Sequence, residues 1–313
     1  FVFNISREGI IMWDGTHIMT LNNGYHLWTH SENTTGREDL LCLHGGPGDT
    51  HEVYERFGLE LKSLGITVHT YDQLGSWYSD TPNWRDPQIR KQYLDMEYYI
   101  SEVEEVRQKL GLEKFYLAGH SWGGLLSMEY ALRYPEHLKG LIIISMIDNI
   151  ADYVTHLKEI LNDEFASYQV EYMSDTELRG EYQDPAYRKY IDHMYKEYVN
   201  RKQPSKMSHQ IDIQSKPVYN TFQGDNEFII NGDLDGWDRS NDIHNIKVPT
   251  LLTFGAHETM PLATAQRMQK SIPNSRLVIT PNGGHNHMVD NPEVFFTNLR
   301  RYFTDIFQGK FGE

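Results

Sequence analysis

Short apolar runs alternate with longer amphipathic stretches along most of the chain. Continuous apolar runs are typical of strands buried on both faces of a sheet, and an apolar residue at every third or fourth position is typical of a helix. The pattern predicts strands at residues 40–43, 66–71, 115–118, 141–145, 250–254 and 276–280, and helices at residues 53–64, 96–110, 125–133, 263–270 and 294–307. Because strands and helices alternate, we expect an α/β fold with a mostly parallel sheet flanked by helices. Asn23-Gly24, between two β-like runs within residues 9–29, predicts an antiparallel hairpin leading into this sheet.

The alternation stops between residues 150 and 245. This stretch is polar and rich in tyrosine and acidic residues, with helical patterns at residues 153–161 and 187–200. Sheet-like spacing resumes at Val248-Pro249-Thr250. We therefore expect residues 150–245 to form a mostly helical cap, inserted into a core made of residues 1–149 and 246–313.

Gly119-His120-Ser121-Trp122-Gly123-Gly124 lies between a predicted strand and a predicted helix. A Gly-x-Ser-x-Gly segment in this position forms a sharp, strained turn, the nucleophile elbow of the α/β-hydrolase fold. The turn exposes a serine hydroxyl, which is a poor nucleophile unless a base, an acid and an oxyanion hole accompany it. Ser121 is the candidate nucleophile.

The glycine-rich loop His44-Gly45-Gly46-Pro47-Gly48 follows the first predicted core strand. In this fold one oxyanion donor comes from such a loop, and the other is the backbone N–H of the residue after the nucleophile. The candidate donors are therefore Gly46 and Trp122. Taken alone, the glycines could equally serve only to build a tight turn.

The base is expected late in the chain, because the order in this fold is serine, acid, histidine. His285 directly follows two glycines after the last predicted strand and is the candidate. His287 is two residues further on and is expected to point elsewhere.

The acid is expected in the turn after the strand at residues 250–254, where the chain reads Gly255-Ala256-His257-Glu258. Glu258 stands where aspartate is commoner, and a glutamate can also orient an imidazole. Asp148, which follows the strand at residues 141–145, is the alternative acid. His257 is expected to face solvent.

Charge and cysteine content limit the partners. A formal net charge of −15 disfavours nucleic acid and anionic membranes and favours cationic ligands. No apolar run is long enough to cross a bilayer. The single cysteine, Cys42, cannot form an intramolecular disulfide and is expected in the core. The first residues lack the pattern of a signal peptide, which by itself leaves the compartment open. A cytoplasmic location is expected, with secretion or attachment to the cell envelope as the alternative.

Three motifs together resemble the proline iminopeptidase family of α/β-hydrolases. They are the glycine-rich loop at residues 44–48, Asp72-Gln73-Leu74-Gly75-Ser76 and the elbow at residues 119–124. The resemblance extends over residues 24–303. It is greatest to the enzymes of lactic-acid-type bacteria, which share Phe222-Gln223-Gly224-Asp225-Asn226-Glu227-Phe228 and His257-Glu258-Thr259-Met260.

The resemblance implies a serine exopeptidase that releases an N-terminal residue, preferentially proline, from short peptides with a free N-terminus, through an acyl-enzyme and without metal or cofactor. It also implies that cap acids hold the substrate's ammonium group. Glu227 matches one of them, Glu197 is a weak candidate for a second, and Trp237 is a weak candidate for an apolar wall. Residues 151–245 hold 18 Asp or Glu against 10 Lys or Arg, which favours a negative chamber. The alternatives are an amidase acting on amino-acid amides and, less favoured, a carboxylesterase.

Overall fold

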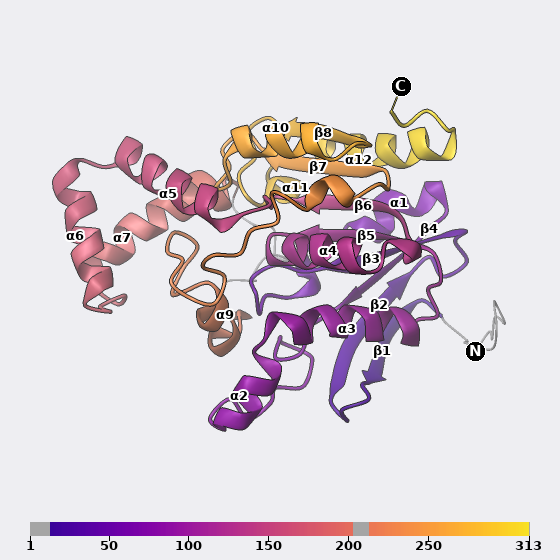
Figure 1. The fold of residues 1–313 in the computed structure, drawn as a ribbon, viewed down its shortest axis with the longest axis horizontal. Coiled ribbons are helices and arrows are strands. Elements are labelled where there is room, and N and C mark those ends of the chain that lie inside the picture. The colour runs from indigo at the N-terminus through magenta and orange to yellow at the C-terminus, as the bar shows by residue number, and fades with distance from the viewer. Residues whose placement is uncertain (1–12, 203–212, 313) are drawn as a thin grey trace.

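The computed structural model describes residues 13–202 and 213–312. These residues form an eight-stranded sheet with the strand order β1-β2-β4-β3-β5-β6-β7-β8 (Figure 1). The strands are β1 (Gly15–Thr20), β2 (His26–Glu32), β3 (Glu38–Leu43), β4 (Ile66–Tyr71), β5 (Phe115–His120), β6 (Leu138–Ile144), β7 (Thr250–Gly255) and β8 (Ser275–Thr280). Strands β3 to β8 pair in parallel, whereas β1 pairs with β2, and β2 with β4, in antiparallel fashion. The predicted parallel sheet and its leading hairpin are confirmed, except that residues 9–12 lie outside the described part.

Both faces of the parallel strands are buried. Along β3, Leu40 and Cys42 face one hydrophobic cluster, and Leu41 and Leu43 face the other. Helices α1 (Phe57–Leu61) and α12 (Pro292–Phe307) cover the first face, and α3 (Met96–Lys109), α4 (Trp122–Arg133) and α10 (Leu262–Ser271) cover the second. This layering explains why the strands read as continuous apolar runs instead of an alternating pattern. The free thiol of Cys42 is buried in the core, as expected.

The helix predicted at residues 53–64 is broken into three short pieces. They are η1 (His51–Tyr54), α1 and η2 (Lys62–Leu64), and the last ends at Gly65 in a left-handed conformation, with φ at 69°. Helix α2 (Pro87–Tyr93) was not predicted, although Asp86 caps its first turn and Pro87 begins it. Helix α11 (His287–Asp290) is a single turn between β8 and α12.

The chain between β6 and β7 is helical and contains no strand among its described residues. It forms α5 (Ile150–Glu164), α6 (Ser167–Leu178), α7 (Pro185–Met194), the π-helical turn η4 (Tyr195–Val199), α9 (Lys216–Phe222) and η5 (Ile243–Asn245). Figure 1 shows α6 and α7 at the end of the molecule farthest from the sheet. The division into a core and a separate cap stays a prediction. Among the described helices, none combines the length and apolar character needed to span a membrane.

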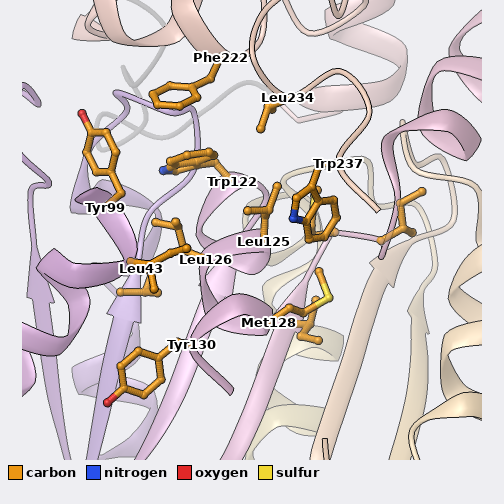
Figure 2. Packing of buried hydrophobic residues seen from close by; sticks show 14 of the residues in the cluster. Leu43, Tyr99, Trp122, Leu125, Leu126, Met128, Tyr130, Phe222, Leu234 and Trp237 are labelled. Atoms are coloured by element: carbon orange, nitrogen blue, oxygen red, sulfur yellow. The ribbon is translucent and has the colours of Figure 1, made fainter. Parts of the chain in front are cut away.

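An aromatic cluster joins this helical region to the sheet behind the elbow. The Trp122 ring at the start of α4 lies 4.7 Å from the Phe222 ring of α9 and 5.7 Å from the Tyr99 ring of α3, measured between centroids. Figure 2 shows the Trp122 indole beneath Phe222 with Tyr99 to one side. Such contacts bury large apolar areas, so the end of α9 is held close to the residue that follows Ser121.

Candidate active site

Ser121 occupies a strained turn between β5 and α4. Its φ and ψ angles are 53° and −121°, a backbone conformation that side chains rarely adopt. A Cβ atom on Gly119 would come within 2.0 Å of the Gly123 carbonyl oxygen, and one on Gly123 would come equally close to the Leu43 carbonyl oxygen. Only glycine fits at these two positions, so the elbow motif follows from how tightly strand and helix approach each other.

The glycine-rich loop is held against the elbow by Gln73. The backbone N–H of Gln73 donates to His44 Nε2 over 2.9 Å, and its side-chain Nε2 donates to the His44 carbonyl over 3.1 Å. The Trp122 indole in turn donates to Gln73 Oε1 over 2.9 Å. Burial lowers the pKa of His44 to about 4, so its neutral ring can accept at Nε2 while Nδ1–H donates to the Gly45 carbonyl. Three motifs that are distant in the sequence therefore form one hydrogen-bonded unit.

His285 and Glu258 are in contact in the buried loops that follow β8 and β7. Glu258 Oε1 lies 2.7 Å from His285 Nδ1, and Thr259 Oγ1 lies 3.1 Å from the same nitrogen. The second oxygen of Glu258 accepts from Ser145 Oγ over 2.7 Å. Burial alone would raise the pKa of Glu258, but the charge and hydrogen bond of His285 outweigh it and lower that pKa to about 2. Glu258 is therefore ionised and fixes the orientation of the imidazole.

The alternative acid, Asp148, is directed elsewhere. Its two carboxylate oxygens receive both terminal nitrogens of Arg267, over 2.7 and 2.9 Å. His287, two residues after His285, is buried with Thr253 Oγ1 2.9 Å from its Nε2, and His257 is exposed, as expected. Among Glu258 and Asp148, only Glu258 lies against His285.

A small pocket joins the predicted site residues. Ser121, Gly46, Trp122 and Glu227 are the predicted site residues in its wall. Gly46 has a φ of 102°, so its backbone turns in a way that glycine alone adopts easily. Six further residues complete the lining: Met146, Ile150, Tyr153, Gln223, Leu234 and Met260. The pocket is thus apolar apart from the serine, the oxyanion candidates, one amide, one phenol and one carboxylate.

Glu227 enters this pocket from the helical region and is held by tyrosine hydroxyls. Its Oε1 accepts from the Tyr153 hydroxyl over 2.5 Å, and its Oε2 accepts from the Tyr219 hydroxyl over 3.3 Å. The Tyr195 hydroxyl accepts from the Glu227 backbone N–H over 3.0 Å. These bonds fix a buried carboxylate, and its Oε1 lies 3.7 Å from His285 Nε2.

Glu197 and Trp237, the two weaker candidates for substrate binding, do not line the pocket. Glu197 lies in η4, and its carboxylate is 3.4 Å from the Arg201 guanidinium with a side chain 38% exposed. Trp237 does not line the pocket, because its indole N–H donates to buried Glu129 over 2.7 Å. A buried indole N–H needs an acceptor, and Glu129 of α4 provides it. Leu234 lines the pocket where Trp237 was expected.

Sequence reasoning missed several residues around the site. Tyr153, Tyr195 and Tyr219 come from three different helices, and no local pattern distinguishes them from tyrosines that only pack. Asp49 directly follows the glycine-rich loop and accepts from Gln214 Nε2 over 2.7 Å. Burial, followed by the nearby charge of Glu227, raises the pKa of Asp49 to about 7. Its position next to the loop was the one signal that could have identified it.

A mostly parallel sheet with a serine on a strained turn after its fifth strand defines an α/β hydrolase. The family model described as alpha/beta hydrolase fold matches residues 40–292. The proline iminopeptidase of Flavobacterium johnsoniae is 31% identical over 287 residues, which cover 90% of this chain and 95% of that protein. The chain belongs to the proline iminopeptidase family of α/β hydrolases.

One further relative agrees with this assignment, and one solved structure shares the fold. The proline iminopeptidase of Lactobacillus delbrueckii subsp. lactis is 29% identical over 80% of this chain and 85% of its own length. The enzymes of lactic-acid bacteria are thus among the relatives, although this one is slightly less similar than the Flavobacterium protein. The crystal structure of a proline iminopeptidase from Mycobacterium smegmatis shares the fold, with a TM-score of 0.80, 24% identity and coverage of 93% of this chain and 98% of that one.

Proposed function

We propose that the protein is a serine aminopeptidase that removes an N-terminal residue, preferentially proline, from short peptides. The observation that carries this proposal is the position of Glu227. Its buried carboxylate shares a small pocket with Ser121, and no Lys or Arg in the described part of the chain forms an ion pair with it. An ammonium group bound there would satisfy the carboxylate and hold the adjoining carbonyl next to the serine.

The reaction begins when Ser121 Oγ attacks the carbonyl carbon of the N-terminal residue. His285 Nε2 takes the hydroxyl proton, while Glu258 holds Nδ1 and stabilises the resulting imidazolium. The backbone N–H groups of Gly46 and Trp122 bind the oxyanion of the tetrahedral intermediate. His285 then gives the proton to the leaving amine, and an acyl-enzyme remains. Water attacks this ester by the same route and releases the free amino acid.

The apolar side of the pocket supports a preference for proline. Met146, Ile150, Leu234 and Met260 contribute apolar side chains to the pocket that also holds the carboxylate. A pyrrolidine ring presents both methylene groups and a secondary ammonium, so it matches both the apolar residues and the acid of this lining.

The family assignment favours this activity over an amino-acid amidase or a carboxylesterase, because the relatives bear the name proline iminopeptidase. The excess of acidic residues between residues 151 and 245 supports substrates with a free, cationic N-terminus. A cytoplasmic location stays a prediction.

Hydrolysis of two anilides tests the proposal. Wild-type protein is expected to cleave the anilide of proline and to leave that of N-acetylproline intact, because acetylation removes the ammonium group. The Ser121→Ala variant is expected to lose on the order of 10⁶-fold in kcat and all labelling by a fluorophosphonate. Equal cleavage of the free and acetylated anilides would exclude an exopeptidase, and full activity of the variant would exclude Ser121 as nucleophile.

A further inference from the structure

One carboxylate faces each ring nitrogen of His285. Glu258 Oε1 lies 2.7 Å from Nδ1, and Glu227 Oε1 lies 3.7 Å from Nε2. The side chains of His285, Glu258 and Glu227 are 4%, 0% and 10% exposed. Nε2 is buried and has no hydrogen-bond partner among the described residues. The nitrogen that must accept the serine proton therefore faces a negative charge.

Glu227 is held where it is by neutral groups. The Tyr153 and Tyr219 hydroxyls donate to its carboxylate, and Thr259 Oγ1 lies 3.5 Å from Oε1. His285 is the one basic residue in the described chain that forms an ion pair with it. Two carboxylates around one imidazole favour the protonated ring, because each stabilises the positive charge in a site with little water.

The other titratable groups near His285 do not offset this effect. They are Asp49 in the loop after β3, His120 at the end of β5 and His287 in α11. Burial lowers the pKa of His120 to about 3 and that of His287 to about 4, so both are neutral near pH 7. Burial also lowers the pKa of His285, but Glu227 and Glu258 outweigh it and raise that pKa to about 9. In the free protein His285 is therefore mostly protonated at neutral pH, and a protonated Nε2 cannot act as a base.

We propose that the ammonium group of the substrate switches on the base, by replacing His285 as the cation that is paired with Glu227. The Nε2 proton then leaves to solvent, and Nε2 is free to accept the hydroxyl proton of Ser121. One proton is released for each substrate bound, and nothing is oxidised or reduced. This inference rests on the proposed function and deepens it, since Glu227 selects free N-termini through the chemical step as well as through binding.

An ester that lacks an ammonium group leaves the Glu227–His285 pair intact. Its hydrolysis therefore reports how Glu227 affects the protonation of His285 when no substrate ammonium is present. In wild-type protein, hydrolysis of p-nitrophenyl acetate is expected to rise with pH along the titration of protonated His285. In Glu227→Gln that titration is expected to lie about 1 to 3 pH units lower, so ester hydrolysis at pH 7 increases about tenfold or more. Hydrolysis of prolyl anilide by the same variant is expected to fall. A merely structural role of Glu227 would lower both activities.

Glu171→Gln is the matched control, because Glu171 is an exposed carboxylate on α6. It is expected to keep the wild-type pH profile with the ester. If the ester profile of Glu227→Gln coincides with that of wild-type protein, or if the variant is only less active, the inference is overturned.

Proton release gives a second measurement that does not depend on a Glu227 variant. Calorimetric titration of Ser121→Ala with proline amide at pH 7, in buffers of different ionisation enthalpy, is expected to show release of nearly one proton. Binding without proton release would overturn the inference while leaving the proposed function standing. Absence of prolyl anilide hydrolysis by wild-type protein would instead refute the proposed function, and the ester profiles would still test the Glu227–His285 pair.

Discussion

The Trp122 indole N–H donates to Gln73 Oε1 over 2.9 Å, and so the residue after Ser121 is tied to a loop from a different strand. Both side chains are buried. The same Gln73 holds His44 through its backbone and its side-chain amide. Trp122 and the glycine-rich loop that carries Gly46 therefore share one anchor.

Gln73→Leu is expected to destabilise the protein by about 1 to 3 kcal/mol, because it leaves the buried Trp122 N–H without an acceptor. It is also expected to lower kcat for prolyl anilide, since the glycine-rich loop loses the side-chain bond to the His44 carbonyl and keeps only the backbone bond to His44 Nε2. Urea unfolding followed by tryptophan fluorescence measures the first effect. Gln88→Leu on exposed α2 is the control and should change stability by less than about 0.5 kcal/mol. Equal stability of both variants would show that the Gln73 bonds contribute nothing.

Glu258→Gln and Asp148→Asn distinguish the two candidate acids. The first is expected to lower kcat for prolyl anilide roughly 10⁴-fold, because an amide cannot hold the imidazole in the correct tautomer. The second removes a charge that pairs with Arg267, so it is expected to lower the melting temperature while kcat stays within a fewfold of wild type. A large loss of kcat in Asp148→Asn, with normal turnover in Glu258→Gln, would reverse the assignment.

The titration of His285 predicts how stability depends on pH. Its pKa is raised from 6.5 to about 9 in the folded protein, so its contribution is fully present below pH 6.5 and is lost as the pH rises through 9. Between pH 6.5 and pH 9 the free energy of unfolding of the wild-type protein is expected to fall by roughly 3 kcal/mol more than that of His285→Gln. Glu258 adds no pH dependence in this window, because its pKa is about 2 in the folded protein, so its contribution is constant here and is lost only at acid pH. Parallel stability curves from urea unfolding at several pH values would contradict the prediction.

Gly123→Ala is expected to abolish activity and to destabilise the protein by several kcal/mol. The added Cβ would lie 2.0 Å from the Leu43 carbonyl oxygen, so β3 and α4 would have to separate. Gly180→Ala is the control, because nothing lies within 4 Å of its Cβ position and only the positive φ of 67° is unfavourable. That change is expected to cost about 1 to 2 kcal/mol. Equal decreases in melting temperature for Gly123→Ala and Gly180→Ala would contradict this prediction.

Most of the core could be predicted because its signals are local. The strands at residues 66–71 and 250–254 match β4 closely and β7 to within one residue, since strands buried on both faces require uninterrupted apolar runs. Helix α2 was missed because seven largely exposed residues carry little periodicity, and residues 51–64 break into short turns that the apolar spacing alone could not distinguish from one helix.

The site residues also separate into those with a local signal in the sequence and those that depend on the tertiary structure. Ser121, Gly46 and His285 could be selected as candidates because glycines or a strained turn stand next to them in the chain, where the backbone itself imposes the sequence. Glu258 was preferred to Asp148 from its place after the strand at residues 250–254. Its contact with His285, the tyrosines around Glu227, and the absence of Glu197 and Trp237 from the pocket lining could not be read from the sequence. They depend on which side chains meet across separations of up to about a hundred residues, and short-range patterns carry no information on those distances. The contact between Glu227 and His285, whose Oε1 and Nε2 atoms lie 3.7 Å apart, also depends on the tertiary structure. It forms only because the helical region folds back over the elbow.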